Sequence, residues 1–99
     1  MNTWVTSGDT VWLKGEFKDR TLAYADPTSV SIKIYDEGEN LLSTMSATKT
    51  ATGKYERDYL VPDSYNTLIY EFTGVLGGYA ATRRDTLSVQ FAVPRYSEV

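Results

Sequence analysis

The chain has 99 residues, 41% of them hydrophobic, and a net charge of −3, a composition that predicts one folded domain and excludes a disordered tail. It contains no cysteine and no histidine, which excludes disulfides, thiolate nucleophiles, histidine-dependent triads and the usual zinc and iron ligand sets. A sequence pI of about 4.8, with Lys and Arg scattered along the chain, argues against nucleic acid as the main partner.

Apolar and polar residues alternate between recurring turn signals, a pattern that predicts an antiparallel sandwich or barrel, and no helical stripe of useful length is present. After a Ser-Gly-Asp turn at residues 7–9, residues 10–18 form the first clear strand. Its inward positions are Val11, Leu13, Gly15 and Phe17. Trp12 falls on the outward face.

A second alternating strand is expected after Pro27, because proline is tolerated where a strand opens. Its inward positions are Val30, Ile32 and Ile34. Residues 36–40, Asp-Glu-Gly-Glu-Asn, are acidic but lack the alternate ligand positions and the distal Glu of a calcium loop. We therefore expect a turn there, followed by a short strand from Leu41 to Met45.

Residues 53–61 form the next predicted strand, with Tyr55, Tyr59 and Val61 on its inward face. The segments 67–76 and 79–93 then flank Gly77-Gly78, a two-residue loop suited to a primed hairpin turn with positive φ. Counting outward from this turn sets Leu76 opposite Tyr79 and Glu71 opposite Arg84 on the outer face. Opposite charges that face each other across two strands stabilise a sheet.

The same register places Arg83 and Asp85 in phase with the inward positions Leu87, Val89 and Phe91. Two unpaired charges in a core would cost too much free energy. Either a bulge re-aims them, or they pair at the rim of the sandwich with each other or with Tyr70, and the rim is the preferred interpretation. For the basic pair Arg83-Arg84, structural pairing is expected before phosphate binding, because no aromatic residues interleave with it.

The spacing of core and turn residues also carries a family resemblance. The residues concerned are Gly8-Asp9-Thr10-Val11 with Leu13 and Phe17, Pro27 with Val30, Ile32 and Ile34, Gly53-Lys54-Tyr55 with Tyr59 and Val61-Pro62-Asp63, Tyr70-Glu71-Phe72, and Gly78-Tyr79. From Gly8 to Val93 this pattern resembles the Ig-like domains of bacterial and bacteriophage proteins, akin to macroglobulin-type and invasin-type modules. The disulfide pair of antibody domains is absent, and Leu68 stands where such folds often place a corner tyrosine.

The resemblance implies an all-β fold, an Ig-like Greek-key sandwich of about seven antiparallel strands that forms a single domain over residues 1–99. It also implies that the second and fifth strands lie in one sheet and the third, sixth and seventh in the other. The first strand and the short strand from Leu41 to Met45 are the expected edges. Such a resemblance specifies a fold far better than a function.

Glu56 and Asp58 share one face of a strand about 7 Å apart, a separation that would suit the two carboxylates of a glycosidase. That face is the solvent side, and it lacks the burial by which glycosidases raise the pKa of their acid. A solvated strand face is therefore expected. We predict no catalytic residue, no cofactor and no metal site, and the chain is predicted not to be an enzyme.

Three exposed apolar residues form the candidate interaction surface. Trp12 points outward, Leu60 falls outward on the strand that the Ig-like topology places beside Trp12, and Trp4 on the first strand is expected to join them. Large apolar groups on an outer face mark contact surfaces, and Trp is enriched among interface anchors. The competing interpretations are a scattered surface aromatic, or a Trp covered by the 19–26 loop or the chain ends.

The expected function is a non-catalytic structural or protein-interaction module, acting through a protein partner or self-association. The resemblance suggests a bacteriophage or prophage virion component, such as a tail, head-joining or decoration protein. The alternative is a carbohydrate-binding or cell-surface adhesion module, with Trp12 or Trp4 as the platform on which a sugar stacks. No secretory signal is visible at the start, and no stretch approaches the ~20 apolar residues of a membrane span, so no membrane partner is expected and the cellular location stays open.

Overall fold

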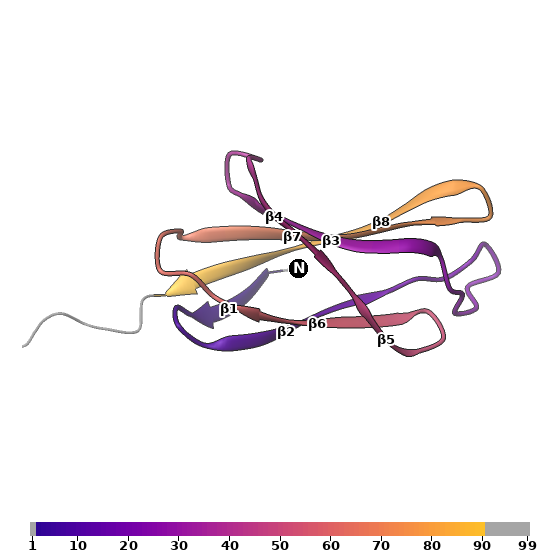
Figure 1. The fold of residues 1–99 in the computed structure, drawn as a ribbon, viewed down its shortest axis with the longest axis horizontal. Coiled ribbons are helices and arrows are strands. Elements are labelled where there is room, and N and C mark those ends of the chain that lie inside the picture. The colour runs from indigo at the N-terminus through magenta and orange to yellow at the C-terminus, as the bar shows by residue number, and fades with distance from the viewer. Residues whose placement is uncertain (1, 91–99) are drawn as a thin grey trace, which may run out of the picture.

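The computed structural model describes residues 2–90, and within this range the chain forms eight strands and no helix (Figure 1). No helix that could cross a membrane is therefore present in the described residues. The strands are β1 (Asn2–Thr6), β2 (Thr10–Glu16), β3 (Thr28–Asp36), β4 (Leu41–Ser46), β5 (Thr48–Ala51), β6 (Lys54–Leu60), β7 (Thr67–Leu76) and β8 (Tyr79–Gln90).

The strands form two sheets that lie face to face as two layers (Figure 1). One sheet has five strands in the order β1-β8-β7-β3-β4, and the other has three in the order β2-β6-β5. The all-β prediction and the expected division of the long strands between two sheets are both confirmed. The expected edges, β1 and the short strand β4, are the edges of the five-stranded sheet.

The eighth strand is β5, which the sequence pattern did not predict. All four of its residues, Thr48 to Ala51, are exposed, so it carries no apolar alternation that would mark a strand. Ala47 alone separates β4 from β5, and Figure 1 shows the chain passing diagonally from one sheet to the other there.

The core lies between the two sheets. It contains most of the predicted inward residues, but the predicted Val11, Val30 and Tyr59 are only partly buried against it, and Val5, Leu68 and Phe72 join it without having been predicted. Its members are Val5, Leu13, Phe17, Ile32, Ile34, Tyr55, Val61, Leu68, Tyr70, Phe72, Leu87 and Val89. Phe17 packs edge-on against Tyr55, with ring centroids 5.8 Å apart, and Tyr70 packs in the same way against Phe72 at 6.1 Å. Each fully buried Phe or Leu side chain contributes about 1.5–3 kcal/mol relative to an exposed one.

The hairpin formed by β7 and β8 has the predicted register. Leu76 pairs with Tyr79 across Gly77 and Gly78, whose φ angles are 61° and 85°. Glu71 pairs with Arg84, and the guanidinium donates to the Glu71 carboxylate, with Nη2 and Oε2 2.9 Å apart. These observations confirm both the primed turn and the cross-strand ion pair. Arg84 also reaches Glu39, in the turn between β3 and β4, at 3.0 Å.

Asp85 bonds Tyr70 at the margin of the core, which is one of the pairings that the rim interpretation predicts. Arg83 instead contacts Glu16 and Phe17, which were not among its predicted partners. The buried Tyr70 hydroxyl donates to the Asp85 carboxylate, and burial, followed by this negative charge, raises the pKa of Tyr70. The Arg83 guanidinium lies 5.5 Å from the centroid of the Phe17 ring and donates from Nε to the Glu16 carbonyl at 3.1 Å. The end of the predicted strand, residues 91–93 with Phe91, lies outside the described residues.

The acidic segment between β3 and β4 is a turn, as expected. Asp36 Oδ1 accepts hydrogen bonds from the backbone N–H groups of Gly38 and Asn40, at 2.9 and 3.0 Å. The backbone and side-chain bonds from Asn40, followed by the Gly38 N–H, lower the pKa of Asp36. The carboxylate therefore stabilises the turn itself.

A second carboxylate, Asp26, ties the loop before β3 to the turn between β5 and β6. Its Oδ2 lies 2.7 Å from the Lys49 ammonium, and its Oδ1 accepts from the Gly53 N–H at 2.7 Å. The Tyr55 hydroxyl also donates to Oδ1, at 3.5 Å. The Lys49 hydrogen bond, followed by that from Gly53, holds the pKa of Asp26 below its usual value.

We expect Asp26→Asn to lower the thermal midpoint of unfolding at neutral pH but much less in acid. Because the pKa of Asp26 is lowered in the folded state, its carboxylate stabilises the fold above its unfolded-state pKa of about 3.9, and this contribution is lost as the pH falls through the folded-state pKa. Circular dichroism melts at neutral pH and below about pH 3 measure the difference. Glu37→Gln, at an exposed carboxylate, is the control and should show no such difference at either pH. A deficit in Asp26→Asn that stays constant with pH would contradict the ionic tie.

Candidate functional site

The outer face of the three-stranded sheet carries two of the three predicted surface residues. Trp12 on β2 is 68% exposed and Leu60 on β6 is 64% exposed. Their strands are paired, with Trp12 opposite Asp58 and Leu60 opposite Thr10. Trp12 and Leu60 are therefore diagonal neighbours on one face, about 7–8 Å apart between backbones. We call the outer face formed by Trp12, Leu60, Lys14, Glu56 and Asp58 the Trp12 face.

Strand alternation explains why this tryptophan is exposed. Val11 and Leu13, its neighbours along β2, point into the core, and Leu13 is fully buried. Trp12 must then point away from the core. At 68% exposed, it is not covered by the 19–26 loop or by another described segment, so that competing interpretation is not supported for residues 2–90.

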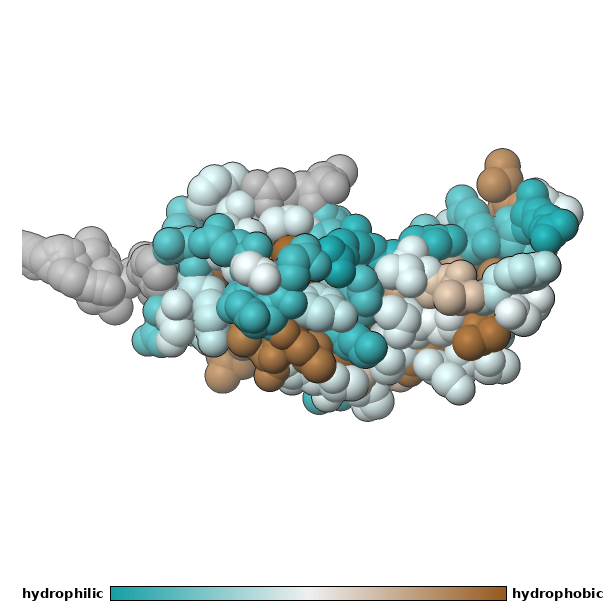
Figure 2. All heavy atoms as spheres, turned by 90° about the horizontal axis from the view of Figure 1, so that it is seen from above, coloured by the Kyte–Doolittle hydropathy of each residue, from teal (hydrophilic) through white to brown (hydrophobic). Residues whose placement is uncertain are grey.

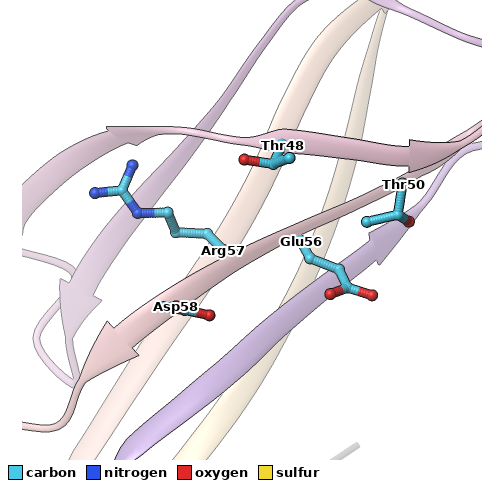
Figure 3. A pocket seen from close by; sticks show the side chains of 5 residues that line it. All are labelled: Thr48, Thr50, Glu56, Arg57 and Asp58. Carbon is cyan, nitrogen blue, oxygen red and sulfur yellow. The ribbon is translucent and has the colours of Figure 1, made fainter.

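The polar part of the Trp12 face contains charges of both signs. Lys14 pairs with Glu56 across β2 and β6, and Thr48 on β5 flanks Glu56 on its other side. A shallow hollow of about 490 Å³ opens here, lined by Thr48, Thr50, Glu56, Arg57 and Asp58 (Figure 3). Arg57 points away from the two carboxylates in Figure 3 and donates from Nη1 to the Ser46 carbonyl at 3.1 Å.

Glu56 and Asp58 lie on the solvent side of β6, where the sequence pattern placed them. Asp58 is exposed and Glu56 is half-buried, and the hollow beside them is open to solvent. Among residues 2–90, no three His, Cys, Asp or Glu side chains gather closely enough to hold a metal ion. The chemistry available on this face is stacking on an indole ring and hydrogen bonding to the flanking polar groups.

Trp4 does not belong to the Trp12 face. It lies on β1, which pairs in parallel with β8 and so belongs to the five-stranded sheet, with Trp4 opposite Ser88. Val5 beside it is buried, so Trp4, also 68% exposed, points outward from that other sheet. The expectation that Trp4 joins Trp12 and Leu60 on one strand-paired surface is therefore wrong, because the two tryptophans lie on different sheets.

The edge strand β4 carries further exposed apolar residues, which strand alternation alone does not predict. Leu41 and Leu42 are both exposed at the start of β4. In Figure 2 one face of the molecule is mostly hydrophilic, with one group of hydrophobic residues at its lower edge and others at its right-hand end. Leu42 departs from the alternation because the ladder between β3 and β4 shifts register beside Tyr35, which pairs with Leu41 while Ile34 pairs with Ser43.

Comparison with known proteins supplies no relative for this chain. It matches no known protein-family model, no curated protein and no solved structure. Its function has to be inferred from the surfaces that the fold displays. Among the surfaces predicted from sequence, the Trp12 face is the strongest candidate for an interaction site, because it combines two largely exposed apolar side chains with charged groups of both signs.

Proposed function

We propose that the domain is an Ig-like Greek-key sandwich that acts as a non-catalytic interaction module. The strand order supports the fold: β2, β6 and β5 take the places of the B, E and D strands of an Ig domain, and β3, β7 and β8 those of C, F and G. β4 extends the five-stranded sheet beyond β3, as the additional strand of variable-type Ig domains extends theirs.

The observation that carries the functional proposal is the Trp12 face. Trp12 and Leu60 are exposed as diagonal neighbours on a folded sheet, and keeping their apolar surface in contact with water costs free energy. A partner that buries this surface would remove that cost. Tryptophan is also among the residues most enriched at the energetic centre of protein interfaces. The partner is a protein or a second copy of this chain, and the resemblance to phage modules suggests a virion component as the setting.

The test is Trp12→Ala, with Trp4→Ala as the matched control, since both side chains are 68% exposed and lie on different sheets. Sedimentation velocity over a range of concentrations measures self-association. Trp12→Ala should weaken it roughly tenfold or more, because truncating an interface anchor costs about 2 kcal/mol. Trp4→Ala should leave it unchanged.

Thermal unfolding of the same variants separates binding from folding. The melting temperature of Trp12→Ala should stay close to that of the parent, because substitutions at exposed positions usually change stability by less than about 0.5 kcal/mol. A large loss of stability would show that Trp12 supports the core. A parent chain that stays monomeric at all concentrations would contradict the self-association form of the proposal.

A second candidate is the carbohydrate-binding module, favoured by the exposed indole of Trp12 next to Asp58 and the Thr-lined hollow of Figure 3. Aromatic platforms flanked by carboxylates and hydroxyl groups suit the apolar face and the hydroxyl groups of a sugar. A glycan array probed with the parent and with Trp12→Ala distinguishes the two functions. Binding lost in the variant would support the sugar platform, whereas an array without hits would contradict it.

A further inference from the structure

The hairpin of β7 and β8 leaves one strand edge open. β1 pairs with β8 only from Thr86 to Gln90. From Tyr79 to Asp85, β8 has β7 on one side and no strand partner on the other among residues 2–90. An open edge presents backbone N–H and C=O groups to which another extended chain can add.

The register identifies which backbone groups this edge presents. Leu76 and Tyr79 flank a two-residue turn and therefore form a hydrogen-bonded pair, after which bonded and non-bonded pairs alternate. Ala80 and Thr82 consequently direct their N–H groups away from β7. The Thr82 carbonyl already accepts from Arg83 Nη1 at 2.8 Å. The two N–H groups and the Ala80 carbonyl are thus available at the edge.

This edge forms one wall of a groove whose other wall is the 17–26 loop. The groove has a volume of about 850 Å³, and its lining includes Lys18, Arg20 and Ala25 from the loop and Tyr79 and Thr82 from β8. Figure 1 places the hairpin and this loop at the same end of the molecule. Tyr79 is 69% exposed, so the groove has a largely solvent-facing aromatic ring at its mouth.

The groove is cationic, although the chain as a whole carries a net charge of −3. Lys18, Arg20 and Arg83 line it, against the single carboxylate of Asp19. The Asp19 carboxylate is hydrogen-bonded within its own loop, because its Oδ1 accepts from the Thr21 N–H at 2.8 Å and from the Thr21 hydroxyl at 2.6 Å. Arg20 has no hydrogen bond or ion pair within residues 2–90.

We propose that this groove binds an extended acidic segment of a partner protein, which adds as a strand to the β8 edge. The open N–H groups recognise the extended backbone, and the cations of the groove recognise acidic side chains along it. Tyr79 packs against the apolar parts of the same segment. The site is separate from the Trp12 face, and it rests on different residues.

Fluorescence anisotropy with a labelled synthetic peptide of alternating Glu and Thr tests the proposal, with a peptide of alternating Lys and Thr as the control. The full chain should bind the acidic peptide, more weakly as salt is added, and should not bind the basic one. Reversing two groove charges together, Lys18→Glu with Arg20→Glu, should weaken binding roughly tenfold or more. Unchanged binding in that variant would overturn the proposal, as would equal binding of single-stranded DNA.

Ala80→Pro tests strand addition itself. Proline removes the N–H that faces the groove and leaves the bonds between β7 and β8 intact, so binding should be lost while the melting temperature changes little. Ala80→Val keeps the N–H and should retain binding. Peptide binding by Ala80→Pro at the parental affinity would overturn the strand-addition mode. Trp12→Ala should still bind the peptide, which separates this site from the proposed function of the Trp12 face.

Discussion

Gly53→Ala should lower the melting temperature by about 15 °C, a large effect for the addition of one methyl group. The φ angle of Gly53 is +73°, which costs an alanine about 1–2 kcal/mol. An added Cβ would also lie 2.6 Å from the Phe17 carbonyl oxygen and 2.9 Å from the Ala25 nitrogen. Both are backbone atoms, so neither can rotate away, and we expect a total loss of about 3 kcal/mol.

The effect is large because three segments meet at this glycine. The Gly53 N–H donates to Asp26, its carbonyl accepts from the Phe17 N–H at 2.8 Å, and the Phe17 carbonyl in turn accepts from the Ala25 N–H at 3.1 Å. The start of the 17–26 loop at Phe17, its end at Ala25 and Asp26, and the turn before β6 are thereby held together. Displacing Gly53 would disturb the wall of the cationic groove as well as the core beside Phe17.

Gly77→Ala is the matched control, because it shares the positive φ but not the crowding. The φ of Gly77 is +61°, and an added Cβ would meet nothing within 4 Å. Its expected cost is about 1 kcal/mol, or about 5 °C in melting temperature. Circular dichroism melts of the two variants measure the difference. Equal losses would show that backbone conformation, and not contact with Phe17 and Ala25, explains the requirement for glycine at position 53.

Much of this fold could be predicted from sequence because its core residues are strongly periodic. In β3 the alternation of Ile32 and Ile34 with polar residues determines which face is buried. Between β7 and β8, Gly77-Gly78 sets the register on its own, since a two-residue primed turn admits one pairing. β5 has neither signal and forms because β6 offers it a partner, an effect of tertiary structure.

The surfaces were less predictable than the core. Strand alternation was enough to predict that Trp12 and Leu60 are exposed on one face, because they lie on paired antiparallel strands. The position of Trp4 depends on the parallel pairing of β1 with β8, between the two ends of the described chain, and no local pattern encodes it. The cationic groove depends on contacts of the same kind, since Lys18 and Thr82 are distant in sequence and meet only in the folded domain.

Gly15→Ala should lower the melting temperature by about 10 °C, through contact across the two sheets. Gly15 lies on β2 and Phe72 on β7, and a Cβ added to Gly15 would lie 2.5 Å from Cγ of the fully buried Phe72 ring. The ring occupies the space that the missing side chain leaves. Packing an extra methyl group into such a core costs about 1–3 kcal/mol, measured by denaturant unfolding.

Phe72→Leu provides the decisive comparison. Alone it should destabilise the domain, because a smaller side chain leaves part of the space beside Gly15 unfilled. Combined with Gly15→Ala it should do less harm than the sum of the two changes, because the new methyl group then occupies space that the ring has vacated. We expect a coupling free energy of about 1 kcal/mol in this double-mutant cycle. Additive losses would mean that Gly15 is not required for packing against Phe72, whereas coupling would show that a strand of one sheet directly contacts a ring of the other.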